Sequence, residues 1–421
     1  MLLATIIEVR LTNSPVGPAF AAFWYQEVGF TVGDAAFRMS LQHWINDAPL
    51  RIFFLVVGLE IKRELTIGHL ASWRSATLPI AAAVGGMVAP ALLFLLVILS
   101  GSWSQGWGVP MATDTAFAIA LLVAMGPCVP VELRIFLTAT AIVDDIGINV
   151  VMASFYSGDI HVVYLLAALA ILECFSLLNW SRIYVLTPYL LLGIVLWALV
   201  YAGGLHATLA GVVLALFIPT RPPANLAALM TQANTIIMAE AQHEGQTLRH
   251  NASAPALRAL DAIHDRIESP ADRLLRRAGA RSSYLVLPLF ALANAGVAIS
   301  IDVLSGHEWL MAAIIVGLVV GKPVGILLAA SLAVWVGIAV KPTEYSWRQL
   351  AGAGAMAGIG FTMSLFIAGQ AFLGASDFSA AKIAVFAASI ISALVGTILL
   401  WGAPSAAAAY TGVQDTRMQG T

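Results

Sequence analysis

The sequence predicts an all-α integral membrane protein with about twelve transmembrane helices. Hydrophobic residues make up 60% of the 421 residues and charged residues only 10%, whereas a soluble domain carries about 25% charged residues. The stretches 76–99 and 183–205 contain no charged residue, and each exceeds the ~20 apolar residues with which a helix crosses a bilayer. We therefore expect a multi-pass protein surrounded by lipid.

Apolar runs separated by charges and by Gly or Pro breaks define the expected spans. The first run contains Glu8 and Arg10, so it forms either a half-span or the end of a span that begins upstream. We treat residues 1–421 as one transmembrane domain. In chain order the runs cover residues 1–13, 41–62, 76–99, 107–125, 131–156, 162–178, 183–202, 204–219, 283–302, 309–339, 347–372 and 379–402.

Two polar segments lie between the spans. Residues 219–282 carry eight arginines, and charges alternate at helical spacing before a break at Pro270, which indicates a helical hairpin in water. Residues 27–40 alternate weakly and contain two glycines, which favours a small β-hairpin. Since basic loops stay in the cytoplasm, we expect 219–282 and both termini there and the 27–40 hairpin outside.

Composition also excludes several classes of function. A net charge of −2 gives no sign of nucleic-acid binding. Cys128 and Cys174 are isolated and fit no disulfide or metal-site spacing, so we interpret both as packing residues. The sequence contains no nucleotide-binding loop and no nucleophile–base pair. We expect no enzymatic activity and no cofactor.

Ionisable residues inside the predicted spans are the strongest functional signal, because a mid-membrane charge costs about 2.5–3.5 kcal/mol on insertion scales. Asp114 lies between Thr113 and Thr115, and such a Thr-Asp-Thr step offers oxygen ligands for a small cation. The same residues can instead satisfy the backbone of an interrupted helix. An interhelical hydrogen-bond clamp that never meets an ion is the alternative.

Asp144 and Asp145 are adjacent and about thirteen residues into the span that begins near Val131, which places them near the bilayer midplane. Two carboxylates there repel each other and lose hydration, so their protons come off as a coupled pair. A bound cation offsets the same cost. Protons and a cation then compete for the same oxygens, which is the chemistry of an exchanger.

Two further features lie in the second half of the chain. Lys322 is within a span and precedes Pro323, where we expect a kink; an aspartate of the pair or a helix carboxyl end is its expected partner, and a static salt bridge is the alternative. Residues 351–369 are rich in glycine. This pattern is typical of close helix packing or of an unwound segment that matches the Asp114 segment in the first half.

At these positions the chain resembles the NhaA family of Na⁺/H⁺ antiporters, from about Leu41 to Trp401. The resemblance rests on eight blocks in the family's order: WIND (44–47), FFLVVGLEIKREL (53–65), MATDTAFA (111–118), AIVDDIG (141–147), GGLHATLAG (203–211), LPLFALANAGV (287–297), GKPVGI (321–326) and GIGFTMSLFIA (358–368).

The resemblance implies an inverted repeat with two crossed, interrupted helices. Asp144 and Asp145 would bind Na⁺ and protons. Asp114, with Thr113, would lie at the crossing and compensate the positive helix ends, while Lys322 would compensate the negative ends and pair with Asp144. The family members exchange Na⁺ or Li⁺ for H⁺ across the bacterial inner membrane, and their homodimers form through an external hairpin.

The resemblance also implies residues that respond to pH. Glu60 and Glu64 match the family's GLE-x-KRE cluster, and His206 matches a family histidine; a charged helix end and a packed polar residue are the alternative interpretations. The segment before residue 287 departs from the family, because Leu275, Arg276 and Gly279 stand where a glutamate and histidines are expected. Activation at a different pH follows from that loss.

The leading hypothesis is therefore an electrogenic, secondary active Na⁺(Li⁺)/H⁺ antiporter that takes part in pH homeostasis. Na⁺ and protons compete for Asp144 and Asp145, and Lys322 is bonded to Asp144 when no cation is bound. Two alternatives remain: a sodium-coupled solute symporter, and a non-transporting membrane sensor of the same fold.

Overall fold

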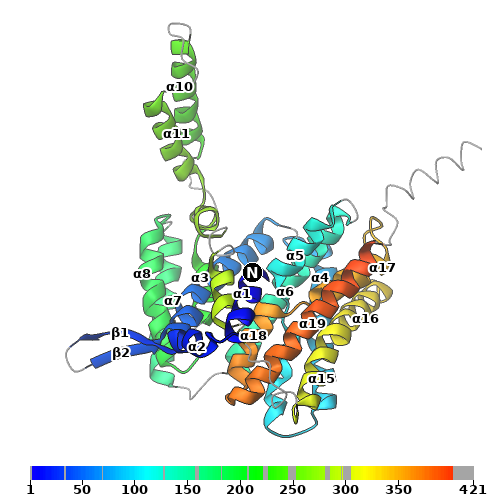
Figure 1. The fold of residues 1–421 in the computed structure, drawn as a ribbon. Helices are drawn as coiled ribbons and strands as arrows, with labels where there is room; N and C mark the ends of the chain where they lie inside the picture. Colours follow the sequence, from blue (N-terminus) through cyan, green and yellow to red (C-terminus); the bar gives the residue numbers. More distant parts are fainter. Residues whose placement is uncertain are drawn as a thin grey trace, which may run out of the picture. The chain divides into compact units, whose positions relative to one another are not determined.

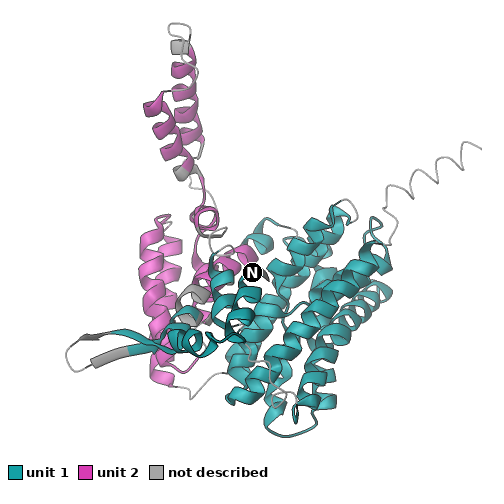
Figure 2. Cartoon of the chain, viewed as in Figure 1, with its two compact units in different colours: residues 1–51, 63–158, 283–421 teal, residues 52–62, 159–282 magenta. Residues whose placement is uncertain are grey.

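The computed structural model describes residues 2–401 except for short segments at 33–34, 69, 127–128, 157–160, 182, 206–207, 221–225, 245–252, 280–284, 295 and 297–304. The described chain is helical apart from one two-stranded hairpin, as the sequence predicts (Figure 1). It divides into two compact units (Figure 2): unit 1 comprises residues 1–51, 63–158 and 283–421, and unit 2 comprises residues 52–62 and 159–282.

Unit 1 contains the long apolar helices of both halves of the chain. Its elements are α1 (Leu2–Thr12), α2 (Gly17–Tyr25), β1 (Glu27–Val32), β2 (Ala35–Ser40), most of α3 (Leu41–Thr66), α4 (Trp73–Val97), the 3₁₀ helix η1 (Ser102–Met111), α5 (Thr115–Ala124), α6 (Val131–Phe155), α13 (Leu287–Asn294), α15 (Glu308–Val316), the π-helical turn η5 (Gly317–Gly321), α16 (Lys322–Trp335), α17 (Trp347–Ala357), α18 (Phe361–Ala371) and α19 (Ala375–Trp401).

Glycines set the closest helix contact in unit 1, between α4 and α16. A Cβ atom on Gly85 would lie 2.3 Å from the carbonyl oxygen of Gly325, and one on Gly325 would lie 2.1 Å from that of Gly85. Small residues let two backbones approach in this way where lipid supplies no hydrophobic drive. The contact fixes α16, and with it Lys322, against α4.

The acidic residue of the first helix, Glu8, is buried close to a basic residue. Glu8 is 2% exposed, and its Oε1 would lie 2.4 Å from a Cβ atom on Gly296. Lys382 of α19 is 7% exposed, donates to the carbonyl oxygen of Gly296 at 2.9 Å and interacts electrostatically with Glu8. A buried charge in a membrane is tolerated when it is paired, so an acid in the first span is compatible with burial.

Unit 2 contains residues 52–62 of α3 and the helices of the middle of the chain. Its apolar core joins α3, α7, α8 and α9 around Leu59, Phe175 and Tyr189. The predicted hairpin in 219–282 is present as α10 and α11, which lie side by side (Figure 1), and α11 ends just before the expected break at Pro270. The elements are α7 (Val162–Trp180), α8 (Leu186–Ala202), α9 (Thr208–Phe217), α10 (Leu226–Glu244), α11 (Ala254–Ile267), α12 (Pro270–Leu274) and the π-helical turn η3 (Leu275–Gly279).

The β-hairpin expected at residues 27–40 is also present. β1 and β2 pair antiparallel, with Glu27 opposite Ser40 and Val32 opposite Ala35. The hairpin leads directly into α3. Its side of the membrane and its part in a dimer remain predictions.

Seven of the expected spans are long and apolar enough to cross a membrane in the described residues. Six are single spans, and the pair α17 and α18 forms a seventh that bends by 46° at its break. The other five expected spans coincide with α1, α8, α9 and α13, which are shorter, and with α3, which carries more charges. The six single spans cover Trp73–Val97, Ser102–Ala124, Val131–Phe155, Val162–Trp180, Glu308–Trp335 and Ala375–Trp401.

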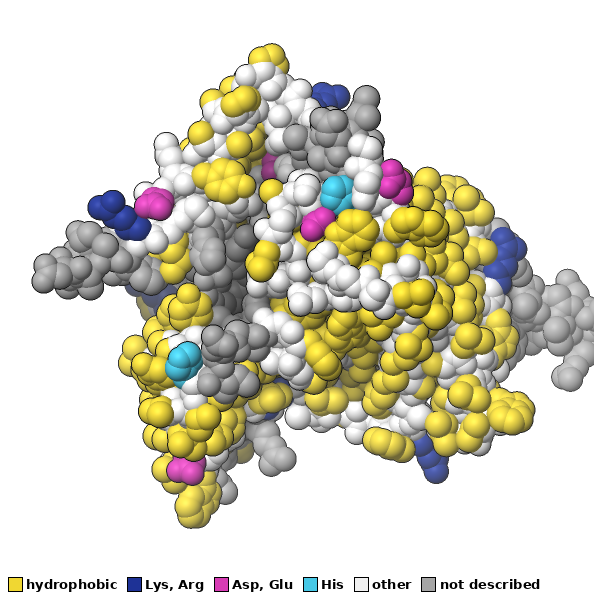
Figure 3. All heavy atoms as spheres, turned by 90° about the horizontal axis from the view of Figure 1, so that it is seen from below, with side chains coloured by type: hydrophobic (Ala, Val, Ile, Leu, Met, Phe, Trp, Pro, Cys, Tyr) yellow, Lys and Arg dark blue, Asp and Glu magenta, His cyan; other side chains and the backbone are white. Residues whose placement is uncertain are grey.

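The surface of these helices is apolar. Large side chains such as Leu92, Leu328 and Ile398 are more than half exposed. Figure 3 shows broad areas of hydrophobic side chains with few charged ones among them. Soluble monomeric proteins rarely expose large contiguous apolar patches, so this surface indicates helices that face lipid.

Candidate functional site

The site forms where two interrupted helices meet in unit 1. The helix η1–α5 is broken at residues 112–114, and the helix α17–α18 is broken at residues 358–360. The two breaks touch, because the Asp114 amide donates to the carbonyl oxygen of Ile359 at 2.6 Å and the Ser364 hydroxyl donates to that of Val109 at 2.8 Å. The first bond joins the two breaks directly and the second joins the helices beside them, so that backbone groups near the interruptions find partners, as irregular backbone within a membrane requires.

Asp114 joins the amino ends of the two broken helices. Its Oδ1 accepts from the amide of Phe117 at 3.1 Å and so caps α5. Its Oδ2 accepts from the amide and the hydroxyl of Thr362, at 3.1 and 2.6 Å, in the first turn of α18. A helix amino end carries a partial positive charge of roughly half a unit, and this 2%-exposed carboxylate faces two of them.

Asp144 and Lys322 form an ion pair beside the crossing. The Lys322 Nζ lies 2.5 Å from the Asp144 Oδ2, and the two side chains are 1% and 2% exposed. The Thr113 hydroxyl is 2.7 Å from the same carboxylate oxygen and 2.9 Å from the carbonyl oxygen of Ala357. A hydroxyl has one proton to donate, so these two oxygens compete for it.

Lys322 also reaches the backbone of the first broken helix. Its ammonium donates to the carbonyl oxygen of Met111, the last residue of η1, where the helix end carries partial negative charge. Lys322 itself begins α16 immediately after the π-helical turn η5. We expected a kink at this position. The structure has a wider π-helical turn there, which accommodates the missing amide of Pro323 within one continuous span.

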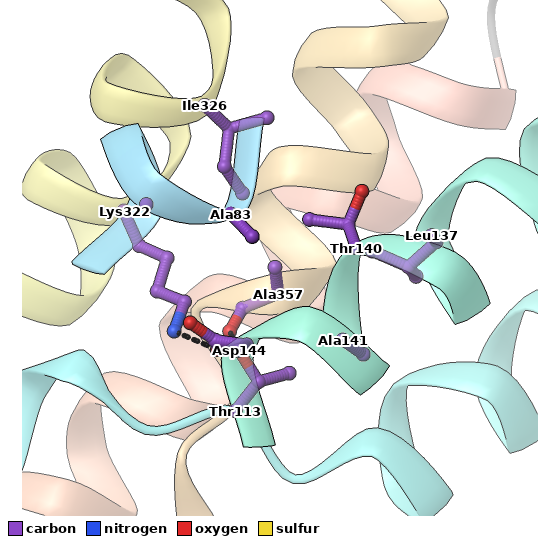
Figure 4. Close-up of a pocket in the computed structure, with 10 residues that line it drawn as sticks. Ala83, Thr113, Leu137, Thr140, Ala141, Asp144, Lys322, Ile326 and Ala357 are labelled. Atoms are coloured by element: carbon purple, nitrogen blue, oxygen red, sulfur yellow. Dashed lines mark hydrogen bonds and ion pairs between the residues drawn. The ribbon is translucent and has the colours of Figure 1, made fainter. Parts of the chain in front are cut away.

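A small pocket borders this ion pair (Figure 4). The Lys322 side chain extends from α16 toward Asp144 and Thr113, and α6 supplies the opposite wall with Thr140. Within the described part of the chain, Asp144 Oδ1 and Thr140 Oγ1 are buried and make no hydrogen bond. The pocket is lined by Ala83, Gly86, Thr113, Leu137, Thr140, Ala141, Asp144, Lys322, Ile326 and Ala357.

Thr140 was missed by the sequence analysis. It precedes Asp144 by four residues on α6, and residues at that spacing lie on one face of a helix. This spacing was readable from the sequence. Hydroxyls in apolar helices are common, however, and only the structure shows that this one lines the pocket.

Asp145 differs from its neighbour in its environment. It is partly exposed and does not line the pocket, since consecutive side chains on a helix point about 100° apart. Its backbone carbonyl accepts from the Asn149 side chain at 2.8 Å. The two adjacent acids are therefore unequal, with Asp144 inside the ion pair.

Comparison with known proteins identifies the family. Residues 1–400 match the family described as Na⁺/H⁺ antiporter 1. The chain belongs to this family.

Similar proteins carry the same description. The chain is 59% identical to the Na⁺/H⁺ antiporter NhaA of Nitrosospira multiformis over 96% of its own length, and it spans 66% of the length of that relative. It is 38% identical to NhaA of Wolinella succinogenes, with 94% and 88% of the two chains covered. NhaA 2 of Aliarcobacter butzleri is 37% identical, with 95% and 92% covered. These names support exchange of Na⁺ for H⁺, and none favours a symporter or a sensor.

One solved structure also aligns with the chain. It is the sodium proton antiporter MjNhaP1 of Methanocaldococcus jannaschii, with 13% identity and a TM-score of 0.43 over 95% of this chain and 90% of that one. At that level the likeness adds nothing to the family assignment.

Of the residues expected to respond to pH, Glu60 and Glu64 are not among those that line the pocket. Glu60 is exposed and Glu64 is partly buried, both near the carboxyl end of α3. Between them, Lys62 donates to the carbonyl oxygen of Ile218, just after α9, so it caps that helix. His206 lies outside the described residues.

The segment that departs from the family pattern contains an ion pair of its own. Arg276 contacts both carboxylate oxygens of Glu268, with the shortest distance at 2.7 Å. The guanidinium lowers the pKa of Glu268 by donating these hydrogen bonds. Arg276 therefore stands where the family pattern places a titratable residue, and it forms an ion pair with the nearby Glu268.

Proposed function

We propose that this chain is a secondary active Na⁺(Li⁺)/H⁺ antiporter, in which the cation and protons compete for Asp144 and Asp145. The observation that carries the proposal is the buried ion pair between Asp144 and Lys322 at the crossing of two interrupted helices. Membership of the Na⁺/H⁺ antiporter 1 family supports the same activity.

The ion pair gives the competition a physical basis. Without a cation, the Lys322 ammonium neutralises Asp144, and neither charge is left alone in a low-dielectric site. A monovalent cation that binds to the Asp144 carboxylate takes the place of the ammonium. The site stays near neutrality only if positive charge leaves it, and protons are the charge that it can release. Uptake of the cation and loss of protons are therefore coupled.

The crossing gives a basis for alternating access. Few hydrogen bonds join one interrupted helix to the other, chiefly those of Asp114 with Thr362 and of Thr113 with Ala357. In this proposal the two broken helices shift against each other around the ion site, and Asp114 and Lys322 compensate the helix ends that face it. Thr113 contributes its hydroxyl to the same site.

We also propose which ions the protein carries, where it lies and how it assembles. Carboxylate and hydroxyl oxygens are hard ligands and suit Na⁺ and Li⁺. Release of up to two protons for each cation makes the exchange electrogenic, so the membrane potential drives export. We place the protein in the bacterial inner membrane with both termini in the cytoplasm, on the arginine and lysine distribution, and we assign the β1–β2 hairpin to a homodimer contact.

Everted membrane vesicles test the activity. We expect Na⁺ or Li⁺ to dissipate a preformed proton gradient in vesicles with the natural chain. Asp144→Asn and Asp145→Asn should abolish the response at matched protein levels. An absence of any Na⁺- or Li⁺-induced proton movement between about pH 6 and pH 9 in the natural protein would rule out the proposed exchange.

A further inference from the structure

Two side chains that line the same pocket each carry a buried oxygen atom that makes no hydrogen bond within the described residues. Asp144 Oδ1 and Thr140 Oγ1 belong to side chains that are 2% and 3% exposed, and neither atom makes a hydrogen bond within the described residues. Both side chains lie on one face of α6, one helical turn apart, and both line the pocket beside Lys322. Two residues that line the pocket thus carry an oxygen that can still accept or donate a hydrogen bond.

An unpaired buried hydroxyl is unfavourable compared with an apolar group of the same shape. Valine has that shape, so packing alone does not account for a threonine at position 140. A second threonine of α6 shows the ordinary arrangement: Thr138 donates to the carbonyl oxygen of Arg134 at 2.9 Å. Thr140 makes no such bond, which leaves its hydroxyl for a partner that arrives in another state of the transporter.

A change of rotamer can bring the Thr140 hydroxyl to the pocket. In Figure 4 its methyl group points toward the pocket and its hydroxyl points away from Asp144. A rotation about χ1 of about 120° brings the hydroxyl to the place of the methyl group, while the methyl group moves to the place of the Cβ hydrogen, and threonine in a helix populates two χ1 rotamers. The hydroxyl then faces the same space as Asp144 Oδ1, and the volume of the side chain is unchanged.

We propose that Thr140 is a further ligand of the transported cation and places its hydroxyl oxygen beside Asp144 Oδ1 when the ion is bound. The inference rests on the proposed exchange at Asp144. The cation lies between Thr140 and Thr113, and the ammonium of Lys322 has left the Asp144 carboxylate. Thr140 then contributes to ion affinity and to the choice between Na⁺ and Li⁺, because one neutral oxygen adds ligand number without adding charge.

Three variants test this role in everted vesicles, with protein levels matched. Thr140→Val removes the hydroxyl at constant volume, Thr140→Ser retains it, and Thr138→Val removes a hydroxyl that is bonded to the backbone of the same helix. We expect Thr140→Val to raise the apparent KM for Na⁺ about five- to tenfold and to change the ratio of the Na⁺ and Li⁺ values. Thr140→Ser should stay within about twofold of the natural protein, and so should Thr138→Val.

A thermal melt separates the ligand role from a structural one. Removal of an unpaired hydroxyl should leave the Tm of the cation-free protein unchanged or higher, while Na⁺ should raise the Tm of Thr140→Val less than that of the natural protein. An unchanged KM in Thr140→Val, or an equal rise in Thr138→Val, would overturn the inference while exchange by the natural protein stands. If the natural protein and Thr138→Val both fail to exchange, the proposed function itself is wrong.

Discussion

Lys322 Nζ lies 2.5 Å from Asp144 Oδ2 although the two residues are 178 positions apart in the chain, and both side chains are almost fully removed from solvent. The pair joins α16 to α6, and Lys322 also bonds the end of η1. Three elements of the crossing therefore depend on one ammonium group.

Lys322→Met should lower the free energy of unfolding in detergent by about 3–5 kcal/mol, because it leaves the Asp144 carboxylate buried without its partner. The double variant Lys322→Met/Asp144→Asn should recover part of that loss, since no uncompensated charge remains. Denaturation of the natural, single and double variants measures the coupling. Strictly additive losses would show that the two groups do not interact.

The carboxylate of Asp114 bonds both broken helices, so the Thr362 hydroxyl should contribute more to the free energy of unfolding than an ordinary helix hydroxyl. Thr362→Val should destabilise the protein by about 1–3 kcal/mol, because a buried carboxylate loses one of its donors. Thr397 of α19 donates only to the backbone of Ala393, so Thr397→Val is a matched control and should cost less than ~0.5 kcal/mol. Equal losses in the two variants would contradict the role given to Asp114 at the crossing.

The contact between α4 and α16 should not tolerate a methyl group. Gly325→Ala places Cβ against the carbonyl oxygen of Gly85, and overpacking of this kind costs about 1–3 kcal/mol. Gly369 of α18 is the control, because a Cβ atom there would meet nothing closer than the Phe378 ring at 3.6 Å. Gly369→Ala should be neutral or stabilise by up to about 1 kcal/mol, as a melt of both variants would show.

The Glu268–Arg276 pair should not contribute to activation at neutral or alkaline pH. Hydrogen bonds from Arg276 lower the pKa of Glu268, so the folded carboxylate is ionised above its ordinary pKa of about 4.3. The stability that it contributes is present above that pH and is lost only as the pH falls through the lowered pKa. Glu268→Gln should therefore leave the pH profile of exchange between about pH 6 and pH 9 unchanged. A shifted profile would assign Glu268 a part in pH response.

Sequence reasoning predicted the elements whose signal is local. Seven spans follow from apolar runs, and the charges of Asp114, Asp144 and Lys322 stand out because lipid excludes them. The β-hairpin at 27–40 and the hairpin of α10 and α11 followed from alternation and charge.

Contacts between distant residues could not be predicted in the same way. The bonds of Asp114 to Thr362 join residues 248 positions apart, and nothing local in either segment indicates the other. The same holds for Glu8, because nothing in the first apolar run indicates that Lys382 and Gly296 lie beside it. Thr140 shows a third limit, because its missing hydrogen bond is a property of the packed pocket and not of the sequence.

The central claim is that protons and the cation compete for Asp144. Calorimetric titration of the purified protein with Na⁺ in buffers of different ionisation enthalpy measures both binding and the protons released with it. We predict that Na⁺ binding releases protons, that the apparent affinity rises with pH, and that Asp144→Asn abolishes both effects. Binding of Na⁺ by the natural protein without proton release, or equal binding and release by Asp144→Asn, would contradict the account.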